Sequence, residues 1–204
     1  MADIVTMDLS SYERASKLVR DGGLVVFPTD TVYGLGCDPF NDGAVSRLFE
    51  AKGRTSKPVP VLCSTVERAS ELVELTPKAL QLAADYWPGA LTIVAPLRRH
   101  MPAQLTQGSS KLGVRVPAHE GCLGFISTCG GWLTGTSANL SGRPSAKTAL
   151  EASSQLSRLV DLILDGGRLS GKESTVVEVD GDRVAILRTG PIGVGDEVKG
   201  RRTS

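Results

Sequence analysis

The order of apolar and polar positions predicts strands and helices that alternate along the first half of the chain. Residues 24–27 are apolar and include β-branched and aromatic types, which is typical of a buried strand. Pro28 ends this strand because proline has no N–H group to donate to a sheet. Apolar residues then recur at helical spacing between 42 and 52, and Gly53 provides a helix stop. The stretch 24–57 is therefore predicted to be a strand, a polar loop with glycines, and a helix.

Capping and turn residues predict where the other elements begin and end. Helix starts are predicted at Ser10, at Asn41 or Asp42, at Ser64, and at Thr76 with Pro77 in the first turn. Helices are predicted to run from these starts to about 21, 52, 75 and 86, and further helices over 119–131 and 147–159. The other strands are predicted at 3–7, 59–63, 90–95, 112–116, 132–136, 160–164, 174–179 and 183–188, with a loop at 96–110.

This element order predicts the α/β fold class, with a twisted, open, mixed sheet flanked by helices. Strands alternate with helices early, and Asp180-Gly181 predicts a hairpin that closes the chain. A length of 204 residues suits one domain, predicted to span 1–192, followed by a short flexible tail at 193–204.

Composition narrows the class of protein but does not identify a reaction. Apolar content of 41% and charged content of 22% are ordinary for a globular protein, and a net charge of +1 gives no overall attraction for nucleic acid. The four cysteines lack C-x-x-C spacing and only two histidines are present, so we predict core cysteines and no metal site. Without a long apolar run or a signal peptide, the expected location is the cytoplasm, with no membrane contact.

Three sets of polar residues could bind an anionic ligand. The cations Lys52, Arg54 and Lys57 follow a strand–loop–helix unit, although cations at a helix end also simply complement its dipole. The segment 136–139 offers hydroxyls and an amide after a strand, although the same residues could cap a following helix. Arg115 and Arg188 lie on strands, where a lone arginine is usually a surface residue.

A fourth segment, 166–173, nearly matches the spacing of a phosphate-binding P-loop. Glu173 replaces the hydroxyl residue that would hold magnesium, and the residues after it read as a strand instead of a helix. We therefore predict that it is not a P-loop. The residues alone indicate an α/β protein that binds a phosphorylated small molecule, and they leave the reaction open.

Six separated motifs make the sequence resemble the YrdC family, the threonylcarbamoyl-adenylate synthases that begin biosynthesis of threonylcarbamoyladenosine (t6A) in tRNA. They are PTDTVYGLG at 28–36, KGR at 52–54, VRVP at 114–117, TSANLSGRPS at 136–145, STVV at 174–177 and LRTGPI at 187–192. The resemblance implies a YrdC-like fold around a large basic cavity. It also implies that L-threonine, bicarbonate and ATP give threonylcarbamoyl-AMP and pyrophosphate, with Mg²⁺ arriving on ATP.

The resemblance also implies roles for individual residues. The catalytic residues are expected to be Lys52 and Arg54. The ATP-binding set is expected to be Lys52, Arg54, Lys57, Lys111, Ser137, Asn139, Ser145 and Arg188. The threonine-binding set is expected to be Thr31, Arg115, Gly135 and Ser174. Because two anions must meet, such a site needs fixed positive charge and ordered donors more than a protein nucleophile.

Two other functions stay open at this point. One is a non-catalytic RNA-binding module, which the near-neutral charge and an aromatic content of 4% disfavour. The other is a related nucleotidyl or carbamoyl transferase that acts on a different substrate. The implied partners of the main interpretation are the downstream tRNA threonylcarbamoyl-transfer machinery and a weak contact with tRNA itself.

Overall fold

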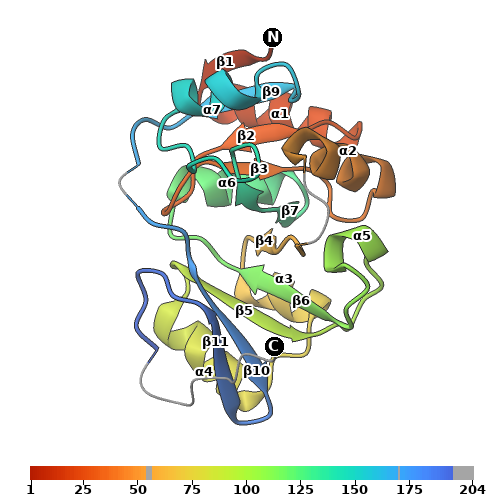
Figure 1. Ribbon diagram of the computed structural model, residues 1–204, viewed down its shortest axis with the longest axis vertical. Helices are drawn as coiled ribbons and strands as arrows, with labels where there is room; N and C mark the ends of the chain where they lie inside the picture. The colour runs from red at the N-terminus through yellow and green to blue at the C-terminus, as the bar shows by residue number, and fades with distance from the viewer. Residues whose placement is uncertain (54–56, 170, 195–204) are drawn as a thin grey trace.

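The strands of the protein form two mixed sheets, which lie toward opposite ends of the long axis (Figure 1). The structure, a computed structural model, describes residues 1–53, 57–169 and 171–194. Arg54 and most of the predicted tail lie outside these ranges. The α/β class is confirmed, but the strands divide between two sheets where the sequence predicted one.

The first sheet has five strands in the order β1-β9-β2-β3-β8. They are β1 (Asp3–Thr6), β9 (Leu162–Asp165), β2 (Val25–Phe27), β3 (Gly34–Gly36) and β8 (Thr136–Ser137). β9 pairs in parallel with β1 and β2, and β3 is antiparallel to β2 and β8.

The second sheet has six strands in the order β11-β10-β5-β6-β4-β7. They are β11 (Arg183–Arg188), β10 (Thr175–Asp180), β5 (Leu91–Pro96), β6 (Lys111–Arg115), β4 (Val61–Cys63) and β7 (Trp132–Thr134). β10 and β11 are antiparallel, which confirms the hairpin predicted at Asp180-Gly181.

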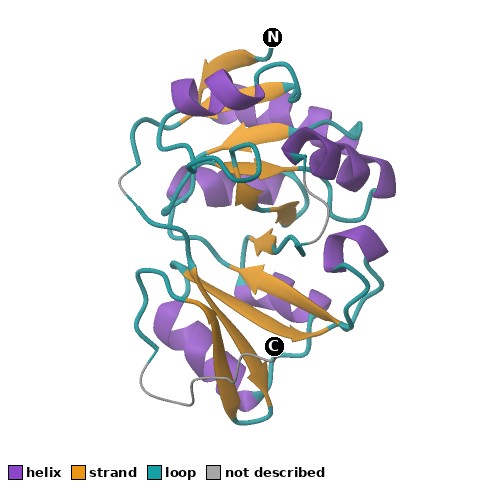
Figure 2. Cartoon of the chain, viewed as in Figure 1, coloured by secondary structure: helices purple, strands orange, loops and turns teal. Residues whose placement is uncertain are grey.

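Seven helices in the described residues surround the sheets (Figure 2). They are α1 (Leu9–Arg20), α2 (Asp42–Lys52), α3 (Val66–Leu72), α4 (Pro77–Tyr86), α5 (Ala103–Thr106), α6 (Glu120–Thr128) and α7 (Ala149–Leu156). None of them is long and apolar enough to cross a membrane.

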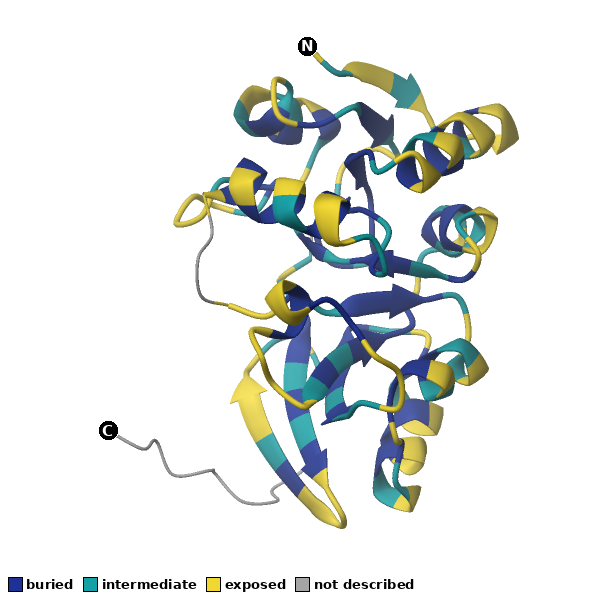
Figure 3. Ribbon diagram, turned by 90° about the vertical axis from the view of Figure 1, so that its right-hand side faces the viewer, coloured by how far each residue is buried: buried dark blue, intermediate teal, exposed yellow. Residues whose placement is uncertain are grey.

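The apolar run at 24–27 is continuous because β2 is buried on both faces. Val25 and Phe27 belong to the core under α1 and α6, whereas Leu24 and Val26 belong to the core under α2 and α7. A strand covered on both faces needs apolar residues at every position instead of every second one. Figure 3 shows these strands buried between helices whose outer faces are exposed.

The chain changes sheets at Gly135, a single residue between β7 and β8. Its N–H donates to the carbonyl of Pro60 at 2.9 Å. A Cβ atom at this position would lie 2.4 Å from Cγ of Leu62, so the crossing requires glycine. The chain also changes sheets between β3 and β4, and again through 166–174, which joins β9 to β10. The sequence-based prediction of a single sheet was wrong because the apolar pattern predicts where strands lie but not which strands pair with one another.

Two of the predicted helix starts are confirmed and two are wrong. Asn41 caps α2 and Thr76 caps α4, with Pro77 in the first turn. Asp8 caps α1 in place of Ser10, because its carboxylate accepts from the N–H of Ser11 at 2.7 Å. α3 likewise starts after Thr65 instead of Ser64, because the Thr65 hydroxyl accepts the Arg68 N–H.

Three other expectations need correction. Residues 34–36 form β3 instead of a loop, and α5 lies within the predicted loop at 96–110. α3 ends at Leu72, before the predicted 75, because Val73 becomes extended and bridges to Leu97. The predicted core role of the cysteines holds for Cys37, Cys63 and Cys122, which are buried and free, whereas Cys129 is half-buried.

Replacing Gly36 with alanine should lower the free energy of unfolding by about 1–3 kcal/mol, because a Cβ there is over-packed. That atom would lie 2.6 Å from the carbonyl oxygen of Thr134 and 2.8 Å from the ring of Phe27. Gly43 is the matched control, since it is exposed in the first turn of α2 with room for a Cβ. Urea denaturation should show Gly43→Ala neutral or stabilising. Equal midpoints for both variants would contradict this packing.

Candidate functional site

A cavity of about 700 Å³ lies between the two sheets and is lined by residues of both. Ten of the twelve residues predicted for the site line it: Thr31, Lys52, Lys57, Lys111, Arg115, Gly135, Ser137, Asn139, Ser174 and Arg188. Arg54 lies outside the described residues. Ser145 does not line the cavity; its hydroxyl donates to Glu173, which does line it. The structure therefore brings together side chains that are far apart in the sequence.

One face of the second sheet forms the floor of the cavity. Alternate residues of a strand share a face, and every second residue of three adjacent strands lines the cavity. These residues are Thr92 and Val94 on β5, Lys111, Gly113 and Arg115 on β6, and Val176 and Glu178 on β10. The floor is therefore apolar in its middle and charged toward both ends.

Lys52, the last residue of α2, fixes the segment after β8. Its ammonium donates to the carbonyl oxygens of Ser137 at 2.5 Å and Asn139 at 2.9 Å, and to Oδ1 of Asn139 at 3.2 Å. Its own carbonyl accepts the N–H of Ser141 at 3.0 Å. The side chain is buried, and these three acceptors are neutral oxygens. An ammonium has three protons, so this arrangement engages all of them.

The segment that Lys52 holds is also ordered by its own hydrogen bonds. The Ser137 hydroxyl donates to Oδ1 of Asn139 at 2.6 Å, and Nδ2 of Asn139 donates to the carbonyl of Arg143. The next helix, α7, begins at Ala149, ten residues after Asn139, and is capped by Thr148. The alternative that Ser137 and Asn139 cap a following helix is therefore wrong.

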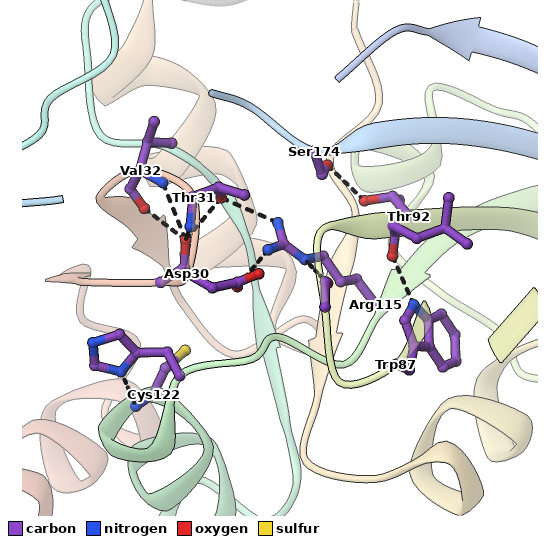
Figure 4. A network of polar contacts seen from close by, with 12 residues as sticks. Asp30, Thr31, Val32, Trp87, Thr92, Arg115, Cys122 and Ser174 are labelled. Carbon is purple, nitrogen blue, oxygen red and sulfur yellow. Dashed lines mark hydrogen bonds and ion pairs between the residues drawn. The ribbon is translucent and has the colours of Figure 1, made fainter. Parts of the chain in front are cut away.

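Arg115 connects the second sheet to the loop after β2 (Figure 4). Its guanidinium donates to Oδ1 of Asp30 at 2.5 Å, to Oγ1 of Thr31 at 3.2 Å and to the carbonyl of Gly89 at 2.8 Å. Arg115 is only 5% exposed. Burial lowers the pKa of the guanidinium and Asp30 opposes that shift, so arginine keeps its charge. These contacts use three of its five N–H donors.

Arg188 and Ser174 form a second network at the start of β10. Arg188 donates from Nε to the carbonyl of Ser174 and from Nη2 to its hydroxyl, both at 3.0 Å. That hydroxyl also shares a hydrogen bond of 2.9 Å with Oγ1 of Thr92 (Figure 4). Both strand arginines line the same cavity, and the charge of Arg188 contributes to lowering the pKa of Arg115. The convergence that sequence left open is therefore present.

Two carboxylates in the lining are each paired with a cation. Glu178 accepts from Lys111 at 2.6 Å and raises the pKa of that ammonium. Glu173 accepts from Arg188 at 2.5 Å and from the Ser145 hydroxyl at 2.7 Å. Sequence analysis did not assign the carboxylate partners Asp30, Glu173 and Glu178, because their contacts join separate segments of the chain.

The segment that resembles a P-loop is the crossing from β9 to β10. A strand follows it where a P-loop needs a helix, as predicted. A Cβ at Gly171 would lie 2.4 Å from the carbonyl oxygen of Thr31, so this glycine allows close passage beside the Thr31 loop. The segment therefore joins the two sheets and packs against the Thr31 loop beside the cavity.

Comparison with known proteins identifies relatives over most of the chain. The Sua5/YciO/YrdC family model, described as "Telomere recombination", matches residues 17–190. A Pyrococcus abyssi protein named threonylcarbamoyl-AMP synthase is 38% identical over 86% of this chain and 53% of its own length. A Halorhodospira halophila protein of the same name is 36% identical, covering 85% of this chain and 92% of its own. This chain thus spans about half of the first relative and nearly all of the second.

A solved structure gives the same result for the fold. The crystal structure of P. abyssi Sua5 complexed with L-threonine superposes with a TM-score of 0.88 at 35% sequence identity. The match covers 93% of this chain and 58% of that one.

Replacing Asp30 with asparagine should lower the free energy of unfolding by about 3 kcal/mol or more, because it leaves the buried charge of Arg115 without its partner. Asp3→Asn is the matched control, since it breaks an ion pair with Arg14 whose side chains are 51% and 64% exposed. Exposed pairs contribute little, so the control should unfold like the wild type. Equal stability of the two variants in urea would contradict the role given to Asp30.

Proposed function

We propose that this chain, which belongs to the Sua5/YciO/YrdC family, is a threonylcarbamoyl-AMP synthase. The reaction joins L-threonine, bicarbonate and ATP, and releases threonylcarbamoyl-AMP, pyrophosphate and water. The observation that carries the proposal is a single cavity whose lining contains residues of both predicted substrate sets, with Lys52 and Arg188 from one and Thr31 and Arg115 from the other. The names of the relatives support the same activity.

The proposed chemistry begins with attack by the threonine amine on bicarbonate, which gives a carbamate and water. A carbamate oxygen then attacks the α-phosphate of ATP, and pyrophosphate leaves. Both reacting groups are anionic, so positioning and positive potential supply most of the catalysis. No protein nucleophile takes part in these steps. Lys52, Arg115 and Arg188, which line the cavity, are suited to that task.

The contacts suggest how the individual residues act. Lys52 would position the backbone and side chains of Ser137 and Asn139 and supply charge, since its protons are engaged by that segment. Arg115 would donate its remaining N–H groups to the threonine carboxylate, with Thr31 and Ser174 beside it. Threonine would then lie at the buried end of the cavity, and ATP would extend toward Lys57 and Lys111.

Magnesium is proposed to enter with the nucleotide, held by phosphate oxygens and water. Among the described residues, no group of three or more His, Cys, Asp or Glu side chains gathers as a metal site. The cavity carboxylates Glu173 and Glu178 each bind a cation of the protein. These residues do not fit a metal site of their own, so no step is assigned to them through magnesium.

The product is proposed to pass to the machinery that transfers the threonylcarbamoyl group to tRNA, in the cytoplasm where tRNA is modified. A weak contact with tRNA would be compatible with this role. The non-catalytic RNA-binding alternative is not favoured, because Lys52 and Arg115 are buried in the cavity and Lys111 and Arg188 are each paired with a carboxylate, so these four cations do not form an open basic face.

Release of pyrophosphate should require all three substrates. With protein, ATP and Mg²⁺ present, omission of threonine or of bicarbonate should each reduce pyrophosphate to the background without protein. Pyrophosphate release that is independent of either substrate would contradict the proposed reaction. Tight RNA binding without turnover would instead support the RNA-binding module.

Substitution of Lys52 by alanine should lower turnover at least about tenfold, equivalent to about 1.4 kcal/mol in the barrier. It removes a buried charge and three hydrogen bonds to the 137–139 segment. We expect the same minimum loss for Arg54→Ala. Lys17→Ala, at an exposed position in the last turn of α1, is the control and should keep wild-type turnover. Wild-type rates in folded Lys52→Ala and Arg54→Ala proteins would contradict the nucleotide position.

A further inference from the structure

Glu173 lies at the junction of two residues that the resemblance assigns to ATP. One oxygen of its carboxylate accepts from the Ser145 hydroxyl at 2.7 Å, and the other accepts from Nη1 of Arg188 at 2.5 Å. Glu173 lines the cavity, whereas Ser145 does not. The carboxylate, not the Ser145 hydroxyl, is therefore the group that faces a bound ligand at this position.

The surrounding structure holds Glu173 in place. Arg188 is tied to the neighbouring residue Ser174 through its carbonyl and hydroxyl oxygens. A Cβ at Gly190 would lie 2.5 Å from the carbonyl oxygen of Glu173, so the two backbones pack closely. The carboxylate is thus fixed from its own backbone, from β11 and from the segment before α7.

The hydrogen bonds of Glu173 determine what it can bind. An ionised carboxylate has about four lone-pair positions and no proton, and Ser145 and Arg188 each use one. The positions that remain can only accept a hydrogen bond. A phosphate oxygen, which is also an acceptor, is excluded from this spot, whereas a hydroxyl group fits.

The position of Glu173 selects the hydroxyl. Its side chain is 38% exposed, at the rim of the cavity, whereas Thr31 and Arg115 on the threonine side are at most 5% exposed. The Glu173 carboxylate also binds Arg188. A nucleotide whose phosphate binds Arg188 would therefore place its ribose next to Glu173. An acidic side chain that accepts from a ribose hydroxyl is a known solution in nucleotide sites.

We propose that Glu173 is the ribose-binding residue of the nucleotide site, and that it accepts a hydrogen bond from the 2′- or 3′-hydroxyl of ATP. The inference rests on the proposed function for the identity of the nucleotide. Ser145 and Arg188 are then positioning residues at this carboxylate, in addition to any contact of Arg188 with phosphate. Glu173 becomes a specificity-determining residue that distinguishes ribonucleotides from deoxyribonucleotides.

The test compares nucleotides and variants together. The wild type should use ATP at least about tenfold better in kcat/KM than 2′-deoxyATP or 3′-deoxyATP, because the deoxynucleotide lacks the hydroxyl that would donate to the Glu173 carboxylate. Glu173→Gln and Glu173→Ala should lose most of that preference, mainly through slower use of ATP. Glu178→Gln is the matched control, since it changes the other cavity carboxylate and should leave the preference unchanged.

Several results would overturn the inference. One is an equal kcat/KM of the wild type for ATP and both deoxynucleotides. Another is a Glu173 variant whose kcat/KM falls by the same factor for every nucleotide, which is the result expected of a purely structural role. If high Mg²⁺ restored the turnover of the Glu173 variants and they kept the preference for ATP over the deoxynucleotides, Glu173 would be assigned to the metal instead. A change confined to the KM for threonine would assign it to the amino acid.

Equilibrium binding separates this inference from the proposed function. If the protein binds ATP without forming product, titration calorimetry with ATP and the deoxynucleotides still measures the preference. Tighter binding of ATP that is lost in Glu173→Gln would support the ribose contact while the proposed reaction fails. Absence of nucleotide binding would overturn both. The urea midpoint of Glu173→Gln checks that the variant is folded.

Discussion

The buried ion pair between Arg115 and Asp30 is the interaction on which the arrangement of the site depends. Arg115 belongs to the second sheet and Asp30 to the loop after β2 of the first. Their contact, together with the bond from Arg115 to Thr31, spans the cavity and sets how far apart the two sheets lie. A guanidinium taken out of water is stable only with such a partner, so the sheets cannot separate here at low cost.

The same principle explains how the cavity can be both charged and stable. Arg188 and Lys111 are each held by a carboxylate, and Lys52 by backbone and amide oxygens. The cations are thereby fixed before a ligand arrives, which lowers the entropy lost on binding. The protein partners of these cations also restrict how a ligand can bind, because an N–H group that donates to the protein is not available to the ligand. Glu173 illustrates this restriction, since its free lone pairs admit only a donor.

The sequence predicted the features that depend on neighbouring residues. It did not predict the contacts between segments that are far apart in the chain. The apolar run into Phe27, the Asn41 cap and the Gly53 stop were predicted because each depends on neighbours in the chain. The family motifs located many of the lining residues through the resemblance that they carry. The pairing of Asp30 with Arg115 joins residues 85 positions apart, and one of the changes of sheet occurs at a single glycine, Gly135. Neither has a local pattern that could predict it.

The central claim is that one cavity brings threonine, bicarbonate and ATP together to form a single product. Mass spectrometry of the reaction with ¹⁵N-threonine and ¹³C-bicarbonate tests it most directly. The account predicts an adenylate that carries both labels, formed in step with pyrophosphate. Unlabelled AMP, or an adenylate with only one of the two labels, would contradict it.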